Sequence, residues 1–353
     1  MKRKIAGVGV GFLYFYVHFV TEVICFFVLG KLVGTNLDLW VLYLFYDMLA
    51  FVPQGIVGYV SDRFPKIPFG IIGLVLLAAA LPLQRFIPFP YVSLAVLCLG
   101  NACTHIDGAE ATLRVSHGLL SPSAIFVAGG SFGVITGQLL AQNAFPRWIL
   151  IPLAATAIPF SILGGMMRRD ADNASPVPCS GFNYARKSVG AVFLILAVVF
   201  IIATRGYMGY GIPTSWKKTA WQTVLLFAAM GFGKALGGVF SDLFGARRVA
   251  FFSAAAALPF LLFGDDLIVV SLIGVMFFSM TMSVTLAVLV SVLKKTPGLA
   301  FGLTTIGLFV GSAPVFFIRF TSFAANCILI AVLTCICLVL TVTVMRKDGG
   351  SNE

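Results

Sequence analysis

Charged residues are scarce in this chain. Only 10% of its 353 residues are charged and 59% are hydrophobic, whereas a soluble domain carries roughly 25% charged residues. The mean hydropathy is +1.02. A membrane-crossing helix needs about 20 mostly apolar residues, and the chain divides into runs of that length with short polar breaks. The composition indicates an integral membrane protein and leaves little room for a soluble ATPase or kinase module.

Histidines and paired cysteines are also scarce. There are three histidines, and the seven cysteines form no Cys-x-x-Cys pair. Most of these cysteines lie within apolar runs, where a thiol behaves as a small hydrophobic group. We therefore expect no disulfide framework, no metal site and no cofactor.

The excess of basic residues gives a net charge of +11, which by itself would suit a nucleic-acid partner. The positive residues, however, stand in short groups between apolar runs, as the positive-inside rule produces in loops on the cytoplasmic side. We expect a lipid bilayer and no nucleic acid around this protein, which we place in the cell (inner or plasma) membrane as a multi-pass monomer.

The apolar runs predict twelve membrane helices. The first begins like a signal peptide, but it continues past Tyr14 and Glu22 without a cleavage site, so we expect it to be retained. The predicted helices are residues 6–29, 38–60, 67–84, 91–113, 121–143, 148–167, 188–208, 219–242, 249–264, 268–292, 298–318 and 323–345. The fold class is therefore all-α, with an N-terminal half at 1–167, a polar central loop at 168–187 and a C-terminal half at 188–353.

The distribution of Lys and Arg predicts the orientation. An even number of helices puts both termini on one side, and most of the 24 basic residues fall on that side. The opposite side holds Lys31, Arg85, Arg147, Lys217, Lys218 and Arg319. The bias predicts that both termini are cytoplasmic.

A short charged turn occurs twice. The chain reads GYVSDRFPK from Gly58 to Lys66 and GVFSDLFGARR from Gly238 to Arg248, each time between the second and third helix of a half. The shared glycines, serines, aspartates and phenylalanines keep one offset of about half the chain. Such an offset indicates a duplicated architecture.

These turns, the six-plus-six helices and the polar central loop resemble the major facilitator superfamily of secondary transporters, whose signature is G-x-x-x-D-R-x-G-R-K. The first copy has Gly58, Asp62, Arg63 and Lys66 but Pro65 at the second glycine. In the second copy Leu243 replaces the arginine beside the aspartate, and the matching residues are Gly238, Asp242, Gly245, Arg247 and Arg248. The resemblance implies two pseudo-symmetric halves of six helices, and the departures leave only the first copy able to form an Asp–Arg pair.

The resemblance also implies a role for the turns. In the family this motif acts as a cytoplasmic latch: the aspartate caps the N-terminus of a neighbouring helix and the basic residues hold the halves in the outward-facing state. A carboxylate is stabilised at a helix N-terminus by unpaired N–H groups and the helix dipole. The basic residues have an equally good explanation as positive-inside anchors.

Ionisable side chains within membrane helices are costly and mark functional paths by default. Here the substrate or ion path is predicted to hold His18, Glu22, Asp47, His105, Asp107, Arg205 and Lys234. From their depth we expect one group of Glu22, Asp47 and Arg205, and a second, closer to the cytoplasm, of His105, Asp107 and Lys234. Glu110 precedes Arg114 by four residues, which favours a structural ion pair on one helix face.

Structural explanations compete with several of these assignments. Glu22 and Arg205 can form a permanent ion pair that fixes the bundle, the histidines can be satisfied core residues, and Lys234 can extend its amine toward the cytoplasm. Glycines in the fifth and eleventh helices are explained by close helix packing.

The resulting functional hypothesis is a secondary active transporter, not an enzyme, that moves a small molecule by alternating access. Glu22 and Asp47 would carry a coupling proton or cation with help from His18 and His105, and Arg205 and Lys234 would attract an anionic or carboxylate-bearing substrate. The alternatives are an efflux pump for lipophilic drugs, a membrane-embedded enzyme that uses His105, Asp107, Glu110 and His117, and a receptor that transports nothing.

Overall fold

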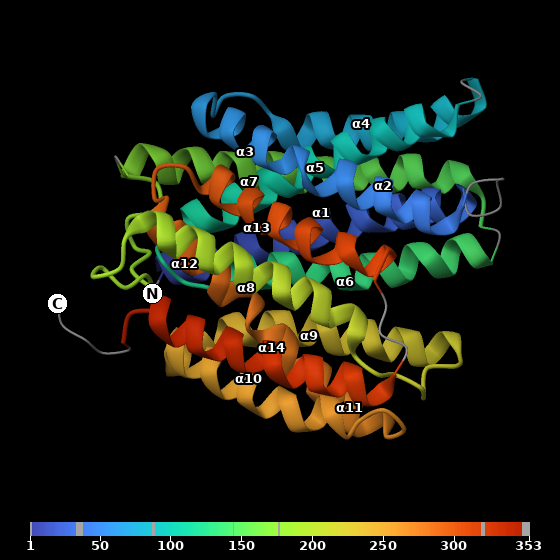
Figure 1. Cartoon of the computed structure of the whole chain (residues 1–353). Helices are drawn as coiled ribbons and strands as arrows, with labels where there is room; N and C mark the ends of the chain where they lie inside the picture. Colours follow the sequence, from blue (N-terminus) through green and yellow to red (C-terminus); the bar gives the residue numbers. More distant parts are fainter. Residues whose placement is uncertain are drawn as a thin grey trace.

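The computed structural model describes residues 2–32, 38–86, 89–143, 145–175, 177–318 and 322–347. Its helices run side by side along one axis, and both termini lie at the same end (Figure 1). In chain order they are α1 (Lys2–Leu32), α2 (Leu39–Phe51), α3 (Pro53–Arg63), α4 (Phe69–Phe86), α5 (Pro90–Val115), α6 (Ser121–Gln142), η1 (Arg147–Ile149), α7 (Leu150–Ala174), α8 (Ala191–Gly211), α9 (Ala220–Phe244), α10 (Ala246–Leu262), α11 (Ile268–Met280), α12 (Met282–Val292), α13 (Pro297–Ser312), η2 (Ala313–Phe316) and α14 (Phe323–Val344).

Each of the twelve predicted segments is mainly helical, and two of them are divided into two α-helices. The second segment consists of α2 and α3, which meet where Pro53 begins α3 without an N–H group to donate. The tenth consists of α11 and α12, which meet at Thr281. In the described residues ten helical segments are long and apolar enough to cross a membrane, while the apolar part of α4 and the 17-residue α10 are shorter.

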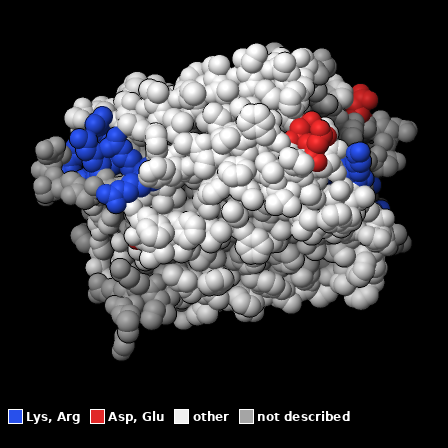
Figure 2. All heavy atoms as spheres, turned by 90° about the horizontal axis from the view of Figure 1, so that it is seen from below, with Lys and Arg blue, Asp and Glu red and all other residues white. Residues whose placement is uncertain are grey.

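The outer surface suits a lipid environment. Large apolar side chains are exposed along the helices, among them Phe193 and Leu196 of α8 and Phe252 of α10. On the face shown in Figure 2, charged side chains gather toward the two ends and a wide uncharged band separates them. An exposed apolar band of this kind is expected around a membrane protein, where lipid rather than water contacts it.

The helices of residues 1–174 lie together in the upper part of Figure 1, and α9, α10, α11 and α14 lie below them. Between these groups, α3 packs against α13 and α6 packs against α9. The division into two pseudo-symmetric halves at 1–167 and 188–353 stays a prediction. Arg319, which entered the charge argument, lies outside the described residues.

Helix α1 packs most extensively against α6, and glycines make this contact close. Gly129, Gly133 and Gly137 recur every fourth residue on α6, and a Cβ on any of them would overlap the backbone of α1. Small residues at such spacing let two membrane helices approach closely. The close contact brings polar side chains of α1 against α6, next to the candidate site.

Candidate functional site

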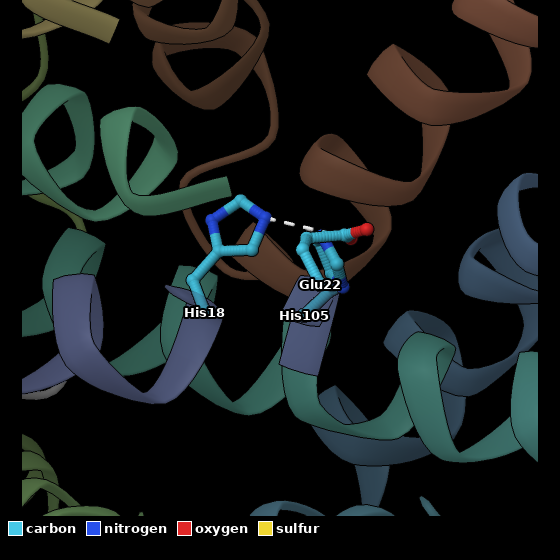
Figure 3. A group of neighbouring side chains, drawn as sticks. All are labelled: His18, Glu22 and His105. Atoms are coloured by element: carbon cyan, nitrogen blue, oxygen red, sulfur yellow. Dashed lines mark ion pairs between the residues drawn. The ribbon is translucent and has the colours of Figure 1, made fainter. Parts of the chain in front are cut away.

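Three ionisable side chains meet between α1 and α5. His18 and Glu22 lie one helical turn apart on α1, and His105 reaches them from α5 (Figure 3). The Nε2 atom of His105 lies 3.4 Å from Oε1 of Glu22, and that of His18 lies 3.8 Å from the same oxygen. Each residue is only 7% exposed. We call this group the His–Glu–His triad.

Neighbouring groups fix the orientation of these three side chains. Nδ1 of His18 lies 2.9 Å from the carbonyl oxygen of Phe126, and Nδ1 of His105 lies 2.9 Å from that of Asn101. A carbonyl oxygen only accepts hydrogen bonds, so each Nδ1 donates. The side-chain amide of Asn101 donates to Oε1 of Glu22 at 3.0 Å. In the neutral rings, Nε2 therefore presents its lone pair toward the carboxylate.

A second buried carboxylate, Asp107, lies two residues after His105 on α5 and points to a different side of the helix. It accepts hydrogen bonds from the hydroxyl of Tyr14 at 2.8 Å and from that of Ser161 at 3.0 Å. Arg168 of α7 is its basic neighbour, at 3.9 Å. Asp107 is thus a partnered carboxylate that joins α1, α5 and α7.

An ion-pair network continues from Asp107 toward the end that holds the termini. Glu110 contacts Arg168, and Arg114 lies 3.7 Å from Glu110, 3.2 Å from Asp62 and 2.9 Å from Asp172. The Glu110–Arg114 contact suggested by the spacing of four is therefore part of a larger network. The network holds four carboxylates and two guanidinium groups, and each carboxylate has at least one basic partner within 4.0 Å. Removing one partner from such a buried network leaves a charge uncompensated.

The two Ser-Asp turns make equivalent contacts across the molecule. Asp62 at the end of α3 accepts hydrogen bonds from the N–H groups of Gly298 and Leu299, at 3.1 and 2.8 Å, at the start of α13. Asp242 near the end of α9 accepts from the N–H groups that begin α6, at 2.8 and 2.9 Å. Each aspartate caps a helix from the other part of the chain, and we call these contacts the two latches. The capping geometry is the one that the family resemblance implies.

Glycines allow the latch helices to touch. A Cβ on Gly58 would overlap the backbone of Gly298, and one on Gly238 would overlap Ala124. Gly245 ends α9 with a φ of 97°, a conformation that other residues rarely adopt. In the first copy Pro65 stands in this place, α3 ends at Arg63, and the C-cap residue Phe64 has an ordinary negative φ of −125°.

The Asp–Arg pair that the first copy could form within its own turn is not the one that the structure contains. Arg63 is exposed, and Asp62 pairs with Arg114 of α5. Consecutive residues on a helix point about 100° apart, so adjacent charges do not face each other. Among the basic residues of the second copy, Arg247 donates to the carbonyl oxygen of Val342 at 3.3 Å.

The remaining intramembrane charges make hydrogen bonds outside the triad. Asp47 of α2 is 8% exposed and accepts a hydrogen bond from Ser312 of α13 at 3.3 Å. Arg205 of α8 donates to the carbonyl oxygen of Phe278 at 3.1 Å and its guanidinium lies 5.2 Å from the centre of that ring. Lys234 of α9 donates to the hydroxyl of Ser131 at 2.9 Å. In the described part of the chain, none of these three has an ion-pair partner.

The groups expected from depth are not the ones that form. His105 joins Glu22 instead of Asp107, because His105 and Asp107 are two residues apart and point to different sides of α5. Arg205 hydrogen-bonds a carbonyl of α11 rather than Glu22.

The enzyme constellation is also not assembled. Asp107 and Glu110 share Arg168 as a partner, whereas His105 contacts Glu22. His117 is exposed in the turn after α5. These four side chains share no common site.

Sequence reasoning missed several partners. Helix α7 continues to Ala174, so Arg168 and Asp172 lie in a helix although the sequence places them in the central loop. Arg168 is 4% exposed and pairs with both Asp107 and Glu110. In the sequence Arg168 is one residue of the polar run at 168–187, and nothing in that run indicates that its side chain is buried.

The connection between α7 and α8 covers the end of the bundle that holds the termini. The hydroxyl of Tyr184 donates to the carbonyl oxygen of Gly118 at 2.6 Å, and the backbone of Cys179 and Arg186 binds that of Lys294 and Val344. Cys179 is 1% exposed, and this burial raises the pKa of its thiol to about 12. The thiol is therefore protonated in this state.

An aromatic contact lies between the latches and the triad. The ring of Phe126, one turn into α6, lies 6.1 Å from that of Phe301 on α13 and 4.9 Å from that of His18. Phe126 is 1% exposed and Phe301 5% exposed. At this end the two latches and this aromatic pair connect helices from the two parts of the chain.

Solved structures with the same helix arrangement cover nearly the whole chain. The human organic anion transporter MFSD10 aligns over 97% of this chain and 98% of its own, with a TM-score of 0.60 and 13% identity. FucP in its outward conformation aligns over 97% of this chain and 99% of its own, with a TM-score of 0.59 and 14% identity. This chain has the major facilitator fold. A variant of the E. coli fucose:proton symporter FucP agrees equally well, with the same coverage, a TM-score of 0.59 and 12% identity.

The similarity between this chain and these transporters is one of fold, because their sequences are only 12–14% identical. No family model matches the chain. A segment is 30% identical over 106 residues to a bacteriorhodopsin of Haloterrigena sp. (strain arg-4), and the match covers 29% of this chain and 42% of that protein. Because less than half of the relative is covered, its activity is not assigned to this chain.

Proposed function

We propose that this protein is a secondary active transporter that moves a small molecule across the membrane by alternating access, with both termini in the cytoplasm. The observation that carries the proposal is the pair of latches. Asp62 and Asp242 each cap a helix from the other part of the chain, and both lie at the same end. Hydrogen bonds at helix ends can break and re-form when helices move as groups, so contacts of this kind suit a reversible closure of one end.

The proposed substrate is an anion or bears a carboxylate. Arg205 and Lys234 have no carboxylate partner among the described residues, and each is satisfied only by a neutral oxygen. A cation within a membrane protein is costly unless something neutralises it, and an anionic substrate would do so. MFSD10, which shares the fold, is named as an organic anion transporter.

The proposed coupling ion is a proton carried by Asp47. This carboxylate is buried, it has a single hydroxyl partner, and no basic side chain of the described residues lies within ion-pair distance. A carboxylate without a counter-ion in such a place is more stable when protonated. Asp47 and Ser312 lie on α2 and α13, so movement of one group of helices against the other would change its surroundings. FucP, which also shares the fold, is named as a fucose:proton symporter.

Drug efflux is the weaker alternative. A cavity for lipophilic cations would favour acidic and aromatic groups without fixed positive charge, and Arg205 and Lys234 oppose such a substrate. Export of ethidium from proteoliposomes, with no transport of any anion, would favour efflux over the present proposal.

A two-stage experiment tests the proposal. Thermal-shift measurements on the purified protein with a panel of small carboxylates and sugar phosphates would first identify ligands, because a ligand that binds the folded state raises its stability with occupancy. Uptake of the best ligand into proteoliposomes under an imposed pH gradient would follow. We expect chemically unaltered substrate to accumulate, and accumulation to fall at least tenfold in Arg205→Ala and Lys234→Ala. Full anion transport in both variants would remove the case for an anionic substrate.

A further inference from the structure

We propose that the His–Glu–His triad is a binding site for a divalent first-row transition-metal cation. The site is formed by Nε2 of His18, Oε1 of Glu22 and Nε2 of His105, and one ligand atom from each residue lies within 4.8 Å of the others. The two histidines come from different helices, so no local spacing motif marks the site in the sequence.

The orientation of the histidines is that of metal ligands. Each Nδ1 donates to a backbone carbonyl, which leaves each neutral Nε2 with a lone pair directed toward Glu22. Metal-bound histidines almost always donate their other ring N–H in this way, and the bond fixes the tautomer and the direction of the ring. Asn101 fixes the third ligand by donating to Oε1 of Glu22 at 3.0 Å.

The distances also fit an ion better than a direct hydrogen bond. The separations of 3.4 and 3.8 Å between the Nε2 atoms and Oε1 are longer than the usual range of about 2.7–3.2 Å for N–H···O bonds. Two ligands about 2.1 Å from a tetrahedral ion lie about 3.4 Å apart. Small movements of the side chains would therefore place all three atoms in contact with one ion.

The surroundings of the triad supply negative charge and oxygen donors. A Cβ at Gly130 of α6 would overlap Nε2 of His18, so the imidazole takes this position against α6 because residue 130 is glycine. Glu22 contacts no Lys or Arg among the described residues. Asn101 is 1% exposed and its Oδ1 atom has no hydrogen-bond partner among them, which leaves one more buried oxygen donor beside the triad.

The ligand set selects the class of metal. Two imidazoles and one carboxylate suit zinc, iron, cobalt, nickel and copper, whereas magnesium and calcium prefer oxygen ligands alone.

Lys234 of α9 is the nearby positive charge that opposes binding of a cation. Its amine donates to the hydroxyl of Ser131, the residue after Gly130, and it lies within electrostatic range of Glu22.

Binding of Co²⁺ to the purified, metal-free full-length protein tests this site. We expect one Co²⁺ per chain, with visible absorption bands of a nitrogen and oxygen site and no thiolate-to-metal band. We expect His18→Gln, Glu22→Gln and His105→Gln each to weaken binding at least tenfold, and Lys234→Met to strengthen it severalfold. His117→Gln is the matched control, since His117 is exposed and remote from the triad, and it should bind as the wild type does. Mg²⁺ and Ca²⁺ should not compete.

Three results would overturn the proposal: no Co²⁺ binding by the wild type, unchanged binding in both triad histidine variants, or a thiolate band showing that cysteines hold the metal. If the variants fail to fold, pulsed EPR of Cu²⁺ bound to the wild type decides the matter, because it reports directly how many imidazoles ligate the ion. Two imidazoles are expected, and fewer would contradict the site. The inference does not depend on transport: metal binding without transport of any solute would refute only the proposed function, and transport without metal binding would refute only this site.

Discussion

The second latch offers a direct measurement of how strongly the closed end is held. In Asp242→Asn, one of the two oxygens that accept the N–H groups at the start of α6 becomes an amide donor, and the negative charge at the helix N-terminus is lost. An N-cap contributes about 0.5–2 kcal/mol, and a charge at a helix terminus about 0.3–1 kcal/mol. We therefore expect the closed state to lose about 1–2 kcal/mol, which raises the population of the open state about 5–30-fold.

Cys179 can report this opening without an introduced cysteine. Its thiol is buried and its pKa is raised to about 12, so maleimide should modify it only when the connection between α7 and α8 moves away. The charges that most affect the pKa of this thiol are those of Arg114, Asp62, Glu110 and Asp172, and a change at Asp242 leaves all four in place. Peptide mass spectrometry of the reaction of Cys179 with N-ethylmaleimide should show a rate about 5–30-fold faster in Asp242→Asn.

A carboxylate at the opposite end provides the control. Asp265 accepts a hydrogen bond from the N–H of Ser215 at 2.8 Å, so Asp265→Asn also removes a charge that binds a backbone donor. It should leave the rate at Cys179 unchanged. Equal acceleration in both variants, or none in Asp242→Asn, would refute the role of the latch.

Three further substitutions test other parts of the structure. Arg168→Met leaves Glu110 buried without its closest basic partner and should lower the free energy of unfolding by about 3–5 kcal/mol. This loss should appear as a lower thermal midpoint of the protein in detergent. Arg169→Met, at the exposed neighbouring position, should change the midpoint little. Gly58→Val places a side chain into the backbone of α13 and should speed modification of Cys179; an unchanged rate would show that the close contact of α3 and α13 is not needed for closure. Asp47→Asn should abolish accumulation of substrate driven by a pH gradient while leaving exchange of substrate between equal pH values, and proton-driven accumulation in this variant would contradict the coupling role.

The helices could be predicted from the sequence, because an apolar run long enough to cross a membrane must satisfy its own backbone hydrogen bonds, which a helix does. Pro53 illustrates the limit, since the run continues through it and only the structure shows that one helix ends and another begins. The capping role of Asp62 and Asp242 also followed from the resemblance carried by their turns. Long, apolar and repeated features are therefore the ones that sequence alone identifies.

The partners of the buried charges could not be predicted in the same way. The face shared by His18 and Glu22 follows from their spacing of four, but the approach of His105 depends on the rotation of α5, which spacing does not give. Arg168 follows an apolar helix and precedes Arg169 and Asp170, so it has the pattern of a loop residue. Its burial depends on Asp107 and Glu110, which lie far from it in the chain, on another helix.

Phe126 makes two contacts whose combination has a thermodynamic consequence. Its ring closes against Phe301, and its carbonyl oxygen accepts the hydrogen bond that orients His18. Any ligand whose binding at the triad shifts Phe126 must change the free energy of the aromatic closure, and by reciprocity opening of that closure must change the affinity of the triad by the same factor. Phe126 thus links ligand binding at the triad to the contact between Phe126 and Phe301. The size of this coupling would follow from the ligand affinity of the triad, measured in variants locked in the open and in the closed state.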